Sequence, residues 1–370
     1  MWRSGFSGCF SPGASSGCRT GCWRGRRPWT CGESTGKGGR TVRRWGWLLA
    51  VAFAVGVASA APAQRVRLRI GYIPVDSFAA LLLAADRYLP QEGFEVEMVR
   101  LPSGAEILSQ VAIGQLQVGG GAMGAAAFNA TVERLPVRFV ASLHNGFIED
   151  YFTVRRAVWG SEINRIAQLR GRPVAINARG VVTEYMMDRV LRSDGIAIED
   201  VDLKTMPFPD MVPALESGAI WAGTVSEPFP TLAEDRGVGV RPLRKPPGAR
   251  PIPFTFVFWN TDWAARNPQA AQRFLVAYLR AARDLAIGGG WQREDNLQVV
   301  ARYTGARLEL LRRARPHHLD PNLNVDTRQL EEQQRFYMRR GYLKYADPLP
   351  LDRIFDFTYV RQAVRELGRR

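Results

Sequence analysis

Two kinds of apolar pattern alternate along the chain from residue 66, and this alternation constrains the fold more than any other feature. Runs of period two, typical of strands, lie at 66–73, 94–101, 117–118 and 137–143. Runs of helical period separate them, at 77–89, 105–113 and 122–133. Glycine or proline follows the first two helical runs. Strands that alternate with helices predict a mostly parallel sheet with helices on both faces.

A second alternating run follows the first. Its strand patterns lie at 171–177, 201–206 and 219–225, and its helical patterns at 181–193, 210–216 and 228–235. Extended segments at 151–156 and 254–259 flank this run, and the rest of the chain is helical. We therefore predict an α/β protein with two parallel-sheet lobes, 65–152 plus 256–370 and 153–255, joined by a two-strand hinge. A ligand would bind between the lobes, where the strands end.

Residues 1–63 have the features of a signal region. Arg43 and Arg44 precede an apolar run at 45–58, and the small residues at 61–63 form a cleavage site before Gln64. An uncleaved anchor is the alternative, although the run is short for a membrane span. Residues 1–41 are interpreted as an untranslated extension, because Val42 would be read from a GTG start codon.

The cysteines and the charge both concentrate near the N-terminus. All four cysteines lie within 1–41, so a chain that starts at Gln64 has none, which suits the oxidising periplasm. Residues 1–63 carry nine basic residues and one acidic residue, about half of the formal charge of +15. The remaining charges are dispersed, which argues against nucleic-acid binding. We expect a periplasmic monomer.

The segment at 117–128 contains a literal G-x-G-x-x-G, formed by Gly119, Gly121 and Gly124. A dinucleotide site would place this motif after the first strand, with an acidic residue at the end of the next strand. Here it follows the third strand, and after the end of the next strand at residues 143–145 no carboxylate appears before Glu149. We expect Gly121 and Ala122 instead to open a helix whose N–H groups bind a small polar ligand. Tight packing of strand against helix is the alternative.

A matching turn at 177–183 is predicted in the second lobe. Asn177, Arg179, Gly180 and Thr183 lie between a strand and a helix. Their donors and the helix N-terminus suit a sulfonate, a carboxylate or a phosphate. A solvent-facing cap with a surface arginine is the alternative.

Four other residues are candidate ligand contacts. Tyr72 and Phe78 flank the first strand–helix turn and could stack on a flat ligand, although Phe78 suits the core equally. His144 ends a strand and is either a ligand contact or a structural hydrogen-bonding group. Glu227 could accept an amine or ring N–H, or it could complement a helix dipole. His317 and His318 lie in a polar loop without a nearby second pair of ligands, so no metal site is predicted.

Three stretches resemble a known family: IGYIP and its continuation to GGG at 70–121, LRGRPVAIN at 169–177, and PFPDMVPALESGAIWAGTVSEPF at 207–229. They are similar to the periplasmic solute-binding proteins of ABC importers that serve nitrate, sulfonates, taurine and thiamine-pyrimidine precursors. Gln117 and Trp221 stand where that family usually has acidic residues. The resemblance covers about residues 66–260 strongly and the helical tail weakly.

The resemblance implies a type II periplasmic binding fold and an exported protein without a cofactor. Such a protein would capture a pyrimidine- or flavin-precursor-like or sulfonate-like molecule and deliver it to an ABC permease in the inner membrane. Alternatives are a sensory protein that feeds a membrane receptor, a chemotaxis binder, or the thiamine-pyrimidine synthase of the same fold. That synthase uses a lysine-bound pyridoxal phosphate and a cysteine-rich motif, but 65–150 holds no lysine and the chain after 63 no cysteine. We therefore predict a binding protein, not an enzyme.

Overall fold

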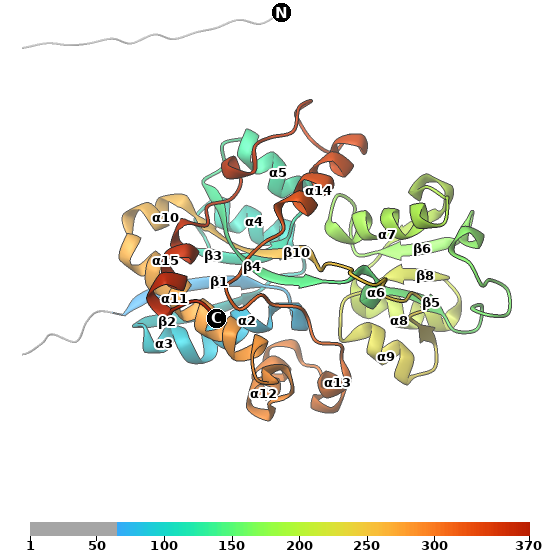
Figure 1. Ribbon diagram of the computed structural model, residues 1–370, viewed down its shortest axis with the longest axis horizontal. Helices are drawn as coiled ribbons and strands as arrows, with labels where there is room; N and C mark the ends of the chain where they lie inside the picture. The colour runs from blue at the N-terminus through green and yellow to red at the C-terminus, as the bar shows by residue number, and fades with distance from the viewer. Residues whose placement is uncertain (1–64) are drawn as a thin grey trace, which may run out of the picture. The chain divides into compact units, whose positions relative to one another are not determined.

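The computed structural model describes residues 65–370 (Figure 1). The predicted signal region at 1–63, with its cleavage site and all four cysteines, therefore lies outside the described residues. Within 65–370, no helix combines the length and the apolar character that crossing a bilayer requires.

The first sheet contains five strands in the order β2-β1-β3-β10-β4. The strands are β1 (Val66–Tyr72), β2 (Phe94–Arg100), β3 (Val118–Ala122), β4 (Val137–Gly146) and β10 (Ile252–Asn260). β1 is parallel to β2 and β3, whereas β10 lies antiparallel between β3 and β4. This sheet with its flanking helices is called the first lobe below.

The second sheet is also five-stranded, in the order β7-β6-β8-β5-β9. Its strands are β5 (Phe152–Arg155), β6 (Pro173–Ile176), β7 (Asp202–Thr205), β8 (Ala222–Thr224) and β9 (Gly239–Val240). β6 is parallel to β7 and β8, and β5 is antiparallel to β8 and β9. Both sheets are thus mixed, because each receives an antiparallel strand from an extended hinge segment. The predicted α/β architecture with two mostly parallel sheets is confirmed, and the structure adds that each sheet contains an antiparallel strand.

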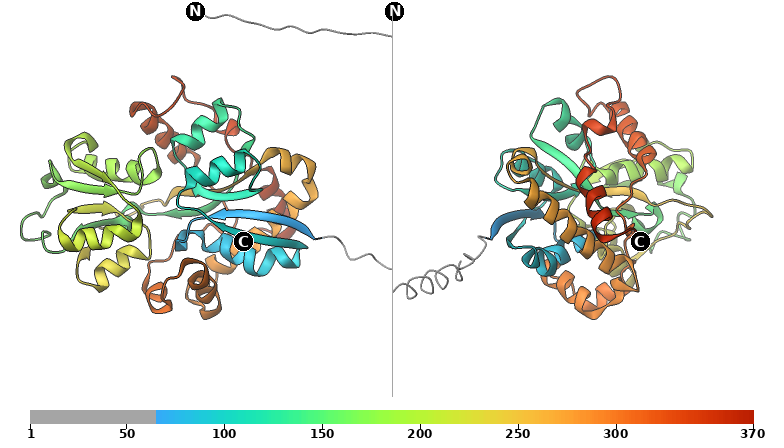
Figure 2. Two further views of the ribbon diagram at one scale, coloured as in Figure 1. Left: turned by 180° about the vertical axis from the view of Figure 1, so that it is seen from behind. Right: turned by 60° about the vertical axis from the view of Figure 1, so that its left-hand side comes forward.

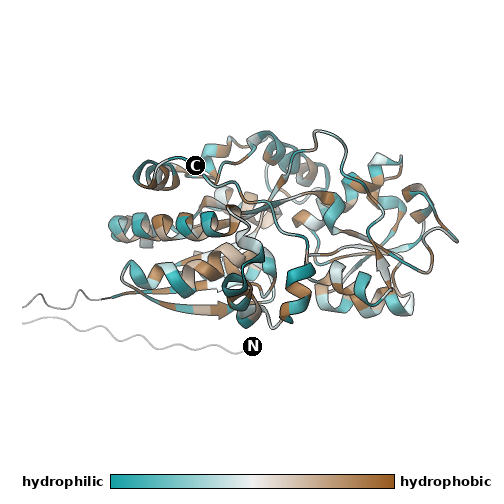
Figure 3. Cartoon of the chain, turned by 60° about the horizontal axis from the view of Figure 1, so that its bottom comes forward, coloured by the Kyte–Doolittle hydropathy of each residue, from teal (hydrophilic) through white to brown (hydrophobic). Residues whose placement is uncertain are grey.

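Helices cover both faces of each sheet (Figure 2). The first lobe carries α2 (Ala79–Leu83), α3 (Leu89–Gln91), α4 (Gly104–Ala112), α5 (Ala125–Val132), α10 (Thr261–Arg266), α11 (Pro268–Ala286), α12 (Glu294–Thr304), α13 (Leu308–Arg313) and α15 (Thr358–Leu367). The second lobe carries α7 (Val182–Ser193), α8 (Phe208–Ser217) and α9 (Phe229–Asp235). In Figure 3 the strands are mostly hydrophobic and many helices alternate polar and apolar residues, as expected of helices packed on a sheet.

Two chain crossings connect the lobes. The first runs from β4 through α6 (Ile148–Tyr151) into β5, and the second returns along β10. The crossings are paired at their edge, where Ile252 lies opposite Gly146 and Pro253 opposite Asn145. β10 is buried along its whole length. The hinge is therefore part of the apolar core and not an exposed linker.

Helix α14 (Thr327–Arg339) is a third connection between the lobes. It packs against α5 and β10 of the first lobe and against α7 of the second. The ring of Phe336 lies 5.5 Å from that of Tyr185 on α7, and Tyr337 donates a hydrogen bond of 3.1 Å to the carbonyl of Met123. One apolar cluster consequently continues from the first lobe into the second.

Candidate functional site

The turns before α5 and α7 meet across the lobe boundary. The N–H of Ala125, the first residue of α5, donates to the carbonyl oxygen of Gly180 at 2.7 Å. Gly180 has a φ of 68°, in the left-handed region that favours glycine. A Cβ placed on Gly124 would lie 2.6 Å from that same carbonyl oxygen. The two predicted ligand turns therefore contact each other directly, and the lobes are closed along this edge.

The glycine motif of the first lobe differs from the expectation. Gly121 and Ala122 lie in β3, opposite Phe256 and Thr255 of β10, and the helix begins three residues later than predicted, at Ala125. The reason is steric, because a Cβ on Gly119 would lie 2.3 Å from Ile107 and 3.0 Å from Phe258. The glycines let β3 fit between large side chains, and only Gly124 lies at the helix N-terminus.

Tyr72 and Phe78 both pack into the first lobe. Phe78 is 1% exposed, and a Cβ on Gly120 would lie 2.5 Å from its ring. The ring of Tyr72 contacts that of Tyr303 on α12 edge to face, at 5.9 Å between centroids. In this closed arrangement both aromatic rings serve as core residues.

Most polar groups of the second-lobe turn already form hydrogen bonds within the protein. Thr183 donates to the side-chain oxygen of Asn177, and the N–H of Gly180 donates to Glu184 at 2.6 Å. Arg179 is exposed and donates to the carbonyl of Leu203 at 3.3 Å. The buried Glu184 carboxylate also accepts from Arg340 and from Tyr342, at 3.1 and 2.9 Å. Residues that follow α14 thus hold this turn in place.

His144 belongs to a buried chain of hydrogen bonds that links both crossings to the tail. Its Nδ1 lies 2.9 Å from Thr255 Oγ1 on β10, and its Nε2 contacts the hydroxyl of Tyr151 on α6. That hydroxyl lies 2.9 Å from Nδ1 of His317, whose Nε2 lies 2.7 Å from Asp76. All five residues are buried. Side chains more than 240 positions apart in sequence therefore form one network.

The two histidines of this hydrogen-bond network, His144 and His317, have opposite pKa shifts. Burial, and then the charge of His317, holds the pKa of His144 well below its usual value. Burial alone would also lower the pKa of His317, but the adjacent Asp76 carboxylate outweighs it and raises that pKa. We therefore assign the proton to His317, which donates to both Asp76 and Tyr151. Tyr151 then donates to neutral His144, and His144 donates to Thr255.

Glu227 lies in a second buried cluster, on the second-lobe side. Its carboxylate is 2% exposed and accepts from Arg241 at 2.5 Å, from the hydroxyl of Thr231 at 2.9 Å, and from the N–H of Arg315 at 3.2 Å. Burial raises the pKa of Glu227 despite the Arg241 charge. Arg315 also forms an ion pair with Asp150 at 2.7 Å. The charges around Glu227 are therefore paired within the protein.

Asp76, Tyr151, Arg241, Arg315 and His317 were not identified as site residues from the sequence. Arg241, Arg315 and His317 come close to candidate residues only through tertiary structure, whereas Asp76 lies two positions before Phe78 and Tyr151 seven positions after His144. In the sequence, His317 was considered only as a candidate metal ligand. Within residues 65–370, no group of three or more potential metal ligands gathers at one place.

Changing Asp76 to asparagine should destabilise the protein mainly below about pH 6.5. The raised pKa of His317 contributes stability that is present below its unfolded pKa and lost as the pH rises through the folded pKa. The deficit should be about 1.5–3 kcal/mol in acid, the range for hydrogen bonds to charged groups, and should shrink in alkali. Urea unfolding across this pH range measures it, with Asp347→Asn as the exposed control. A deficit independent of pH would contradict the His317 assignment.

A family model described as the NMT1-like family matches residues 61–303. The chain belongs to the NMT1-like family. It is 23% identical over 344 residues to the bicarbonate transport ATP-binding protein CmpC of Synechococcus elongatus, a match that covers 82% of this chain. The chain spans about half the length of the curated relatives it matches, since 50% of CmpC is covered.

Two solved structures place this member of the family among known folds. The periplasmic nitrate-binding protein NrtA of Synechocystis PCC 6803 superposes with a TM-score of 0.65 at 17% identity, over 82% of this chain and 90% of its own. The desulfurization enzyme DSZB superposes with a TM-score of 0.57 at 16% identity, over 82% of this chain and all of its own. The predicted periplasmic-binding-protein fold is thereby confirmed, and the fold is shared by binders and an enzyme.

Proposed function

We propose that this NMT1-like protein is an exported solute-binding protein that closes two lobes on a small molecule and delivers it to an ABC permease in the inner membrane. The observation that carries the proposal is the Ala125–Gly180 hydrogen bond, which joins the strand-end turns of the two lobes. A contact of this kind forms only when the lobes are closed, so it stabilises the closed state selectively. The fold of NrtA and the transport role named for CmpC support the same proposal.

The ligand-binding residues are proposed as residues at the two turns together with four buried residues of the two lobes. Gly121 and Ala122 lie at the end of β3, just before the first-lobe turn, and Asn177, Arg179, Gly180 and Thr183 lie in the second-lobe turn and at the start of α7. Tyr72, Phe78, His144 and Glu227 lie at the ends of neighbouring strands or in the loops and helical turns that follow them. In the closed arrangement the two turns contact each other, whereas Tyr72, Phe78, His144 and Glu227 contact other residues of the protein. A ligand would take up some of these hydrogen bonds when the lobes are open and would be enclosed as they close.

The paired charges around Glu227 and His317 favour a ligand of low net charge. An additional buried charge would lack a partner, and burying an unpaired charge is costly. A flat ring that carries nitrogen atoms, such as a pyrimidine or flavin precursor, satisfies this condition. A sulfonate-like anion is the second class, which would recruit the exposed Arg179.

Ligand screening by thermal shift tests this proposal. The panel consists of nitrate, bicarbonate, alkyl sulfonates, aromatic acids, and pyrimidine and flavin precursors. A ligand at one hundred times its Kd stabilises a protein by about 2.7 kcal/mol, which raises the Tm by several degrees. We expect one chemical class to do so in a saturable way, and silence across the panel would contradict the proposal.

The same ligand should lose affinity when Asn177 is changed to alanine. Asn177 is half-buried at the second-lobe turn and bonds Thr183, so its loss should cost about 1 kcal/mol, or roughly fivefold in Kd. Asn164→Ala is the matched control, because Asn164 is exposed elsewhere in the second lobe. Equal affinities of the two variants would remove the turn from the site.

An enzymatic function is the second candidate, because DSZB shares the fold. The buried His317–Asp76 pair has the geometry of a histidine–carboxylate pair that could transfer a proton. Mass spectrometry of the ligand after incubation distinguishes the two functions, since a binder returns the ligand unchanged. Permease and ATPase genes beside this gene would favour import, whereas a receptor gene would favour sensing.

A further inference from the structure

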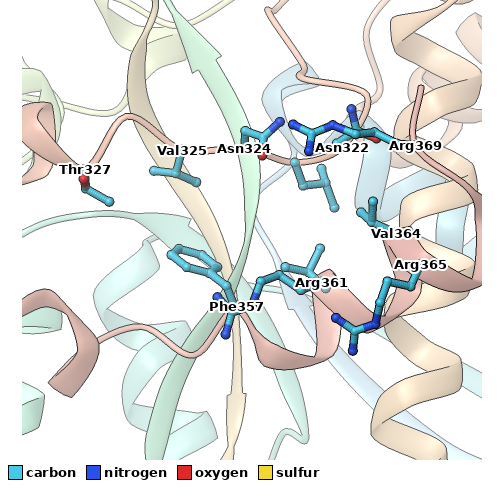
Figure 4. Close-up of a pocket in the computed structure, with 11 residues that line it drawn as sticks. Asn322, Asn324, Val325, Thr327, Phe357, Arg361, Val364, Arg365 and Arg369 are labelled. Carbon is cyan, nitrogen blue, oxygen red and sulfur yellow. The ribbon is translucent and has the colours of Figure 1, made fainter.

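A pocket lies on the first lobe, away from the turns that meet at Gly124 and Gly180. It is a hollow of about 420 Å³ between α15 and the segment that leads into α14 (Figure 4). Its apolar lining consists of Leu323, Val325, Phe357, Val360 and Val364. The volume lies in the range of small-molecule sites.

Three arginines border this apolar surface. Arg361, Arg365 and Arg369 follow at intervals of four residues, and Figure 4 shows them beside the hollow. Within residues 65–370, no carboxylate lies within 4.0 Å of any of their guanidinium groups. Arg361 donates a single side-chain hydrogen bond, of 3.2 Å, to Thr358. Many other arginines of the chain, by contrast, are paired with acids.

This arrangement of like charges is unfavourable for the helix itself. Cations four residues apart on a helix repel each other. Arg361 is the fourth residue of α15, next to the helix end where the macrodipole disfavours a cation. A bound anion would relieve both effects, and the planar guanidinium group suits the two or three oxygens of an acid group.

We propose that this pocket binds an anion with an apolar body, namely an alkyl or aryl carboxylate or sulfonate. The body would cover Val325, Phe357 and Val364, and the acid group would lie between Arg361 and Arg365. Two other occupants, residues 1–63 of this chain and a second copy of the chain, are excluded because they carry the same positive charge as the pocket. Residues 1–63 carry nine basic residues and one acidic residue, and a second copy of the chain carries the same net charge of +15.

Titration with the fluorescent dye anilinonaphthalene sulfonate tests the proposal. We expect saturable binding with one site, and at least a tenfold loss of affinity in the Arg361→Glu/Arg365→Glu variant. Arg236→Glu/Arg244→Glu is the matched control, since both residues are exposed in the second lobe and outside the pocket. The control should bind like the parent protein. Equal losses in the two double variants would indicate a nonspecific charge effect and overturn the proposal.

Two further measurements separate the body from the acid group. Val364→Gln places a polar side chain on the apolar surface and should also lower the affinity for the dye, without a change of charge. The uncharged analogue phenylnaphthylamine should bind at least tenfold more weakly than the sulfonate. Unchanged dye affinity in Val364→Gln, or equal affinities of the two dyes, would overturn the proposal.

The dye could also enter the cleft between the lobes, and a cleft variant distinguishes the two places. Gly124→Val should leave dye binding unchanged if the pocket beside α15 is the site. Loss of binding in Gly124→Val but not in the Arg361/Arg365 variant would overturn the proposal. Sedimentation with phosphatidylglycerol vesicles without saturable dye binding would assign the arginines to a lipid surface and overturn it as well.

Discussion

Changing Gly124 to valine should lower the affinity for the cleft ligand by about tenfold to a hundredfold, which corresponds to about 1.4–2.8 kcal/mol. A Cβ at this position would lie 2.6 Å from the Gly180 carbonyl oxygen and 3.3 Å from the Cα of Val181. Both are backbone atoms of the other lobe and cannot swing aside. Separation of the lobes is therefore the simplest way to relieve the clash.

The effect should act on closure and not on the fold of either lobe. Gly124 has φ −147° and ψ −179°, an extended conformation that any residue adopts, so valine introduces no backbone strain. If the ligand binds the closed state tightly, its apparent Kd rises in proportion to the lost closed population. The hydrogen bond from Ala125 to Gly180 is lost at the same time.

Small-angle scattering and ligand titration together measure this result. The variant should have a larger radius of gyration than the parent protein without ligand, and urea unfolding of similar midpoint. Ala126→Val is the control, because Ala126 is exposed in the first turn of the same helix. A variant with parental scattering and parental affinity would show that this contact plays no part in closure.

The sequence predicted the elements well because their causes are local. Apolar periodicity and the glycines and prolines near helix ends identified most strands and helices to within a few residues. The late start of α5 is the instructive exception. The segment from Gly119 to Ala122 consists of flexible glycines and a helix-forming alanine, so nothing local predicts a strand. It forms one because β10, more than 130 positions away in sequence, pairs with it. Tertiary pairing outweighed local preference there.

The candidate site was less predictable because its interactions are not local. The segment at 254–259 was recognised as a strand, yet nothing in it specifies an antiparallel place between β3 and β4. Asp76 and His317 are 241 positions apart, and their pairing depends on the path of the tail after α13. The strand-end turns were found because the carboxyl ends of parallel strands share an edge. The side chains that the tail brings to that edge could not be predicted from the sequence.

Changing Arg241 to methionine should destabilise the protein by about 3–5 kcal/mol at neutral pH, the cost of breaking a buried ion pair. The side chains of Arg241 and Glu227 are each 2% exposed, and they pair at 2.5 Å. Methionine fills much of the same volume but leaves the Glu227 carboxylate with only uncharged donors, Thr231 and the N–H of Arg315. The pair with the half-exposed Glu234 is lost too, at smaller cost.

The pH dependence identifies the uncompensated carboxylate as the cause. Burial already raises the pKa of Glu227, and loss of the arginine should raise it further. A carboxyl whose folded pKa is raised binds its proton more tightly in the folded state, so stability falls as the pH rises through that pKa. The deficit of the variant should therefore be small near pH 5 and grow toward about pH 8, because Glu227 is protonated only in acid.

A double variant separates the charge from the lost packing. Glu227→Gln/Arg241→Met removes both charges and should recover most of the stability at neutral pH, because replacing a buried pair by uncharged groups is often close to neutral. Arg236→Met, at an exposed site of the same lobe, controls for the loss of one surface arginine. If the double variant were as unstable as Arg241→Met at neutral pH, packing would be the cause. Recovery would instead mean that Glu227 depends on a partner for its charge, which is the condition under which a ligand amine could compete for it.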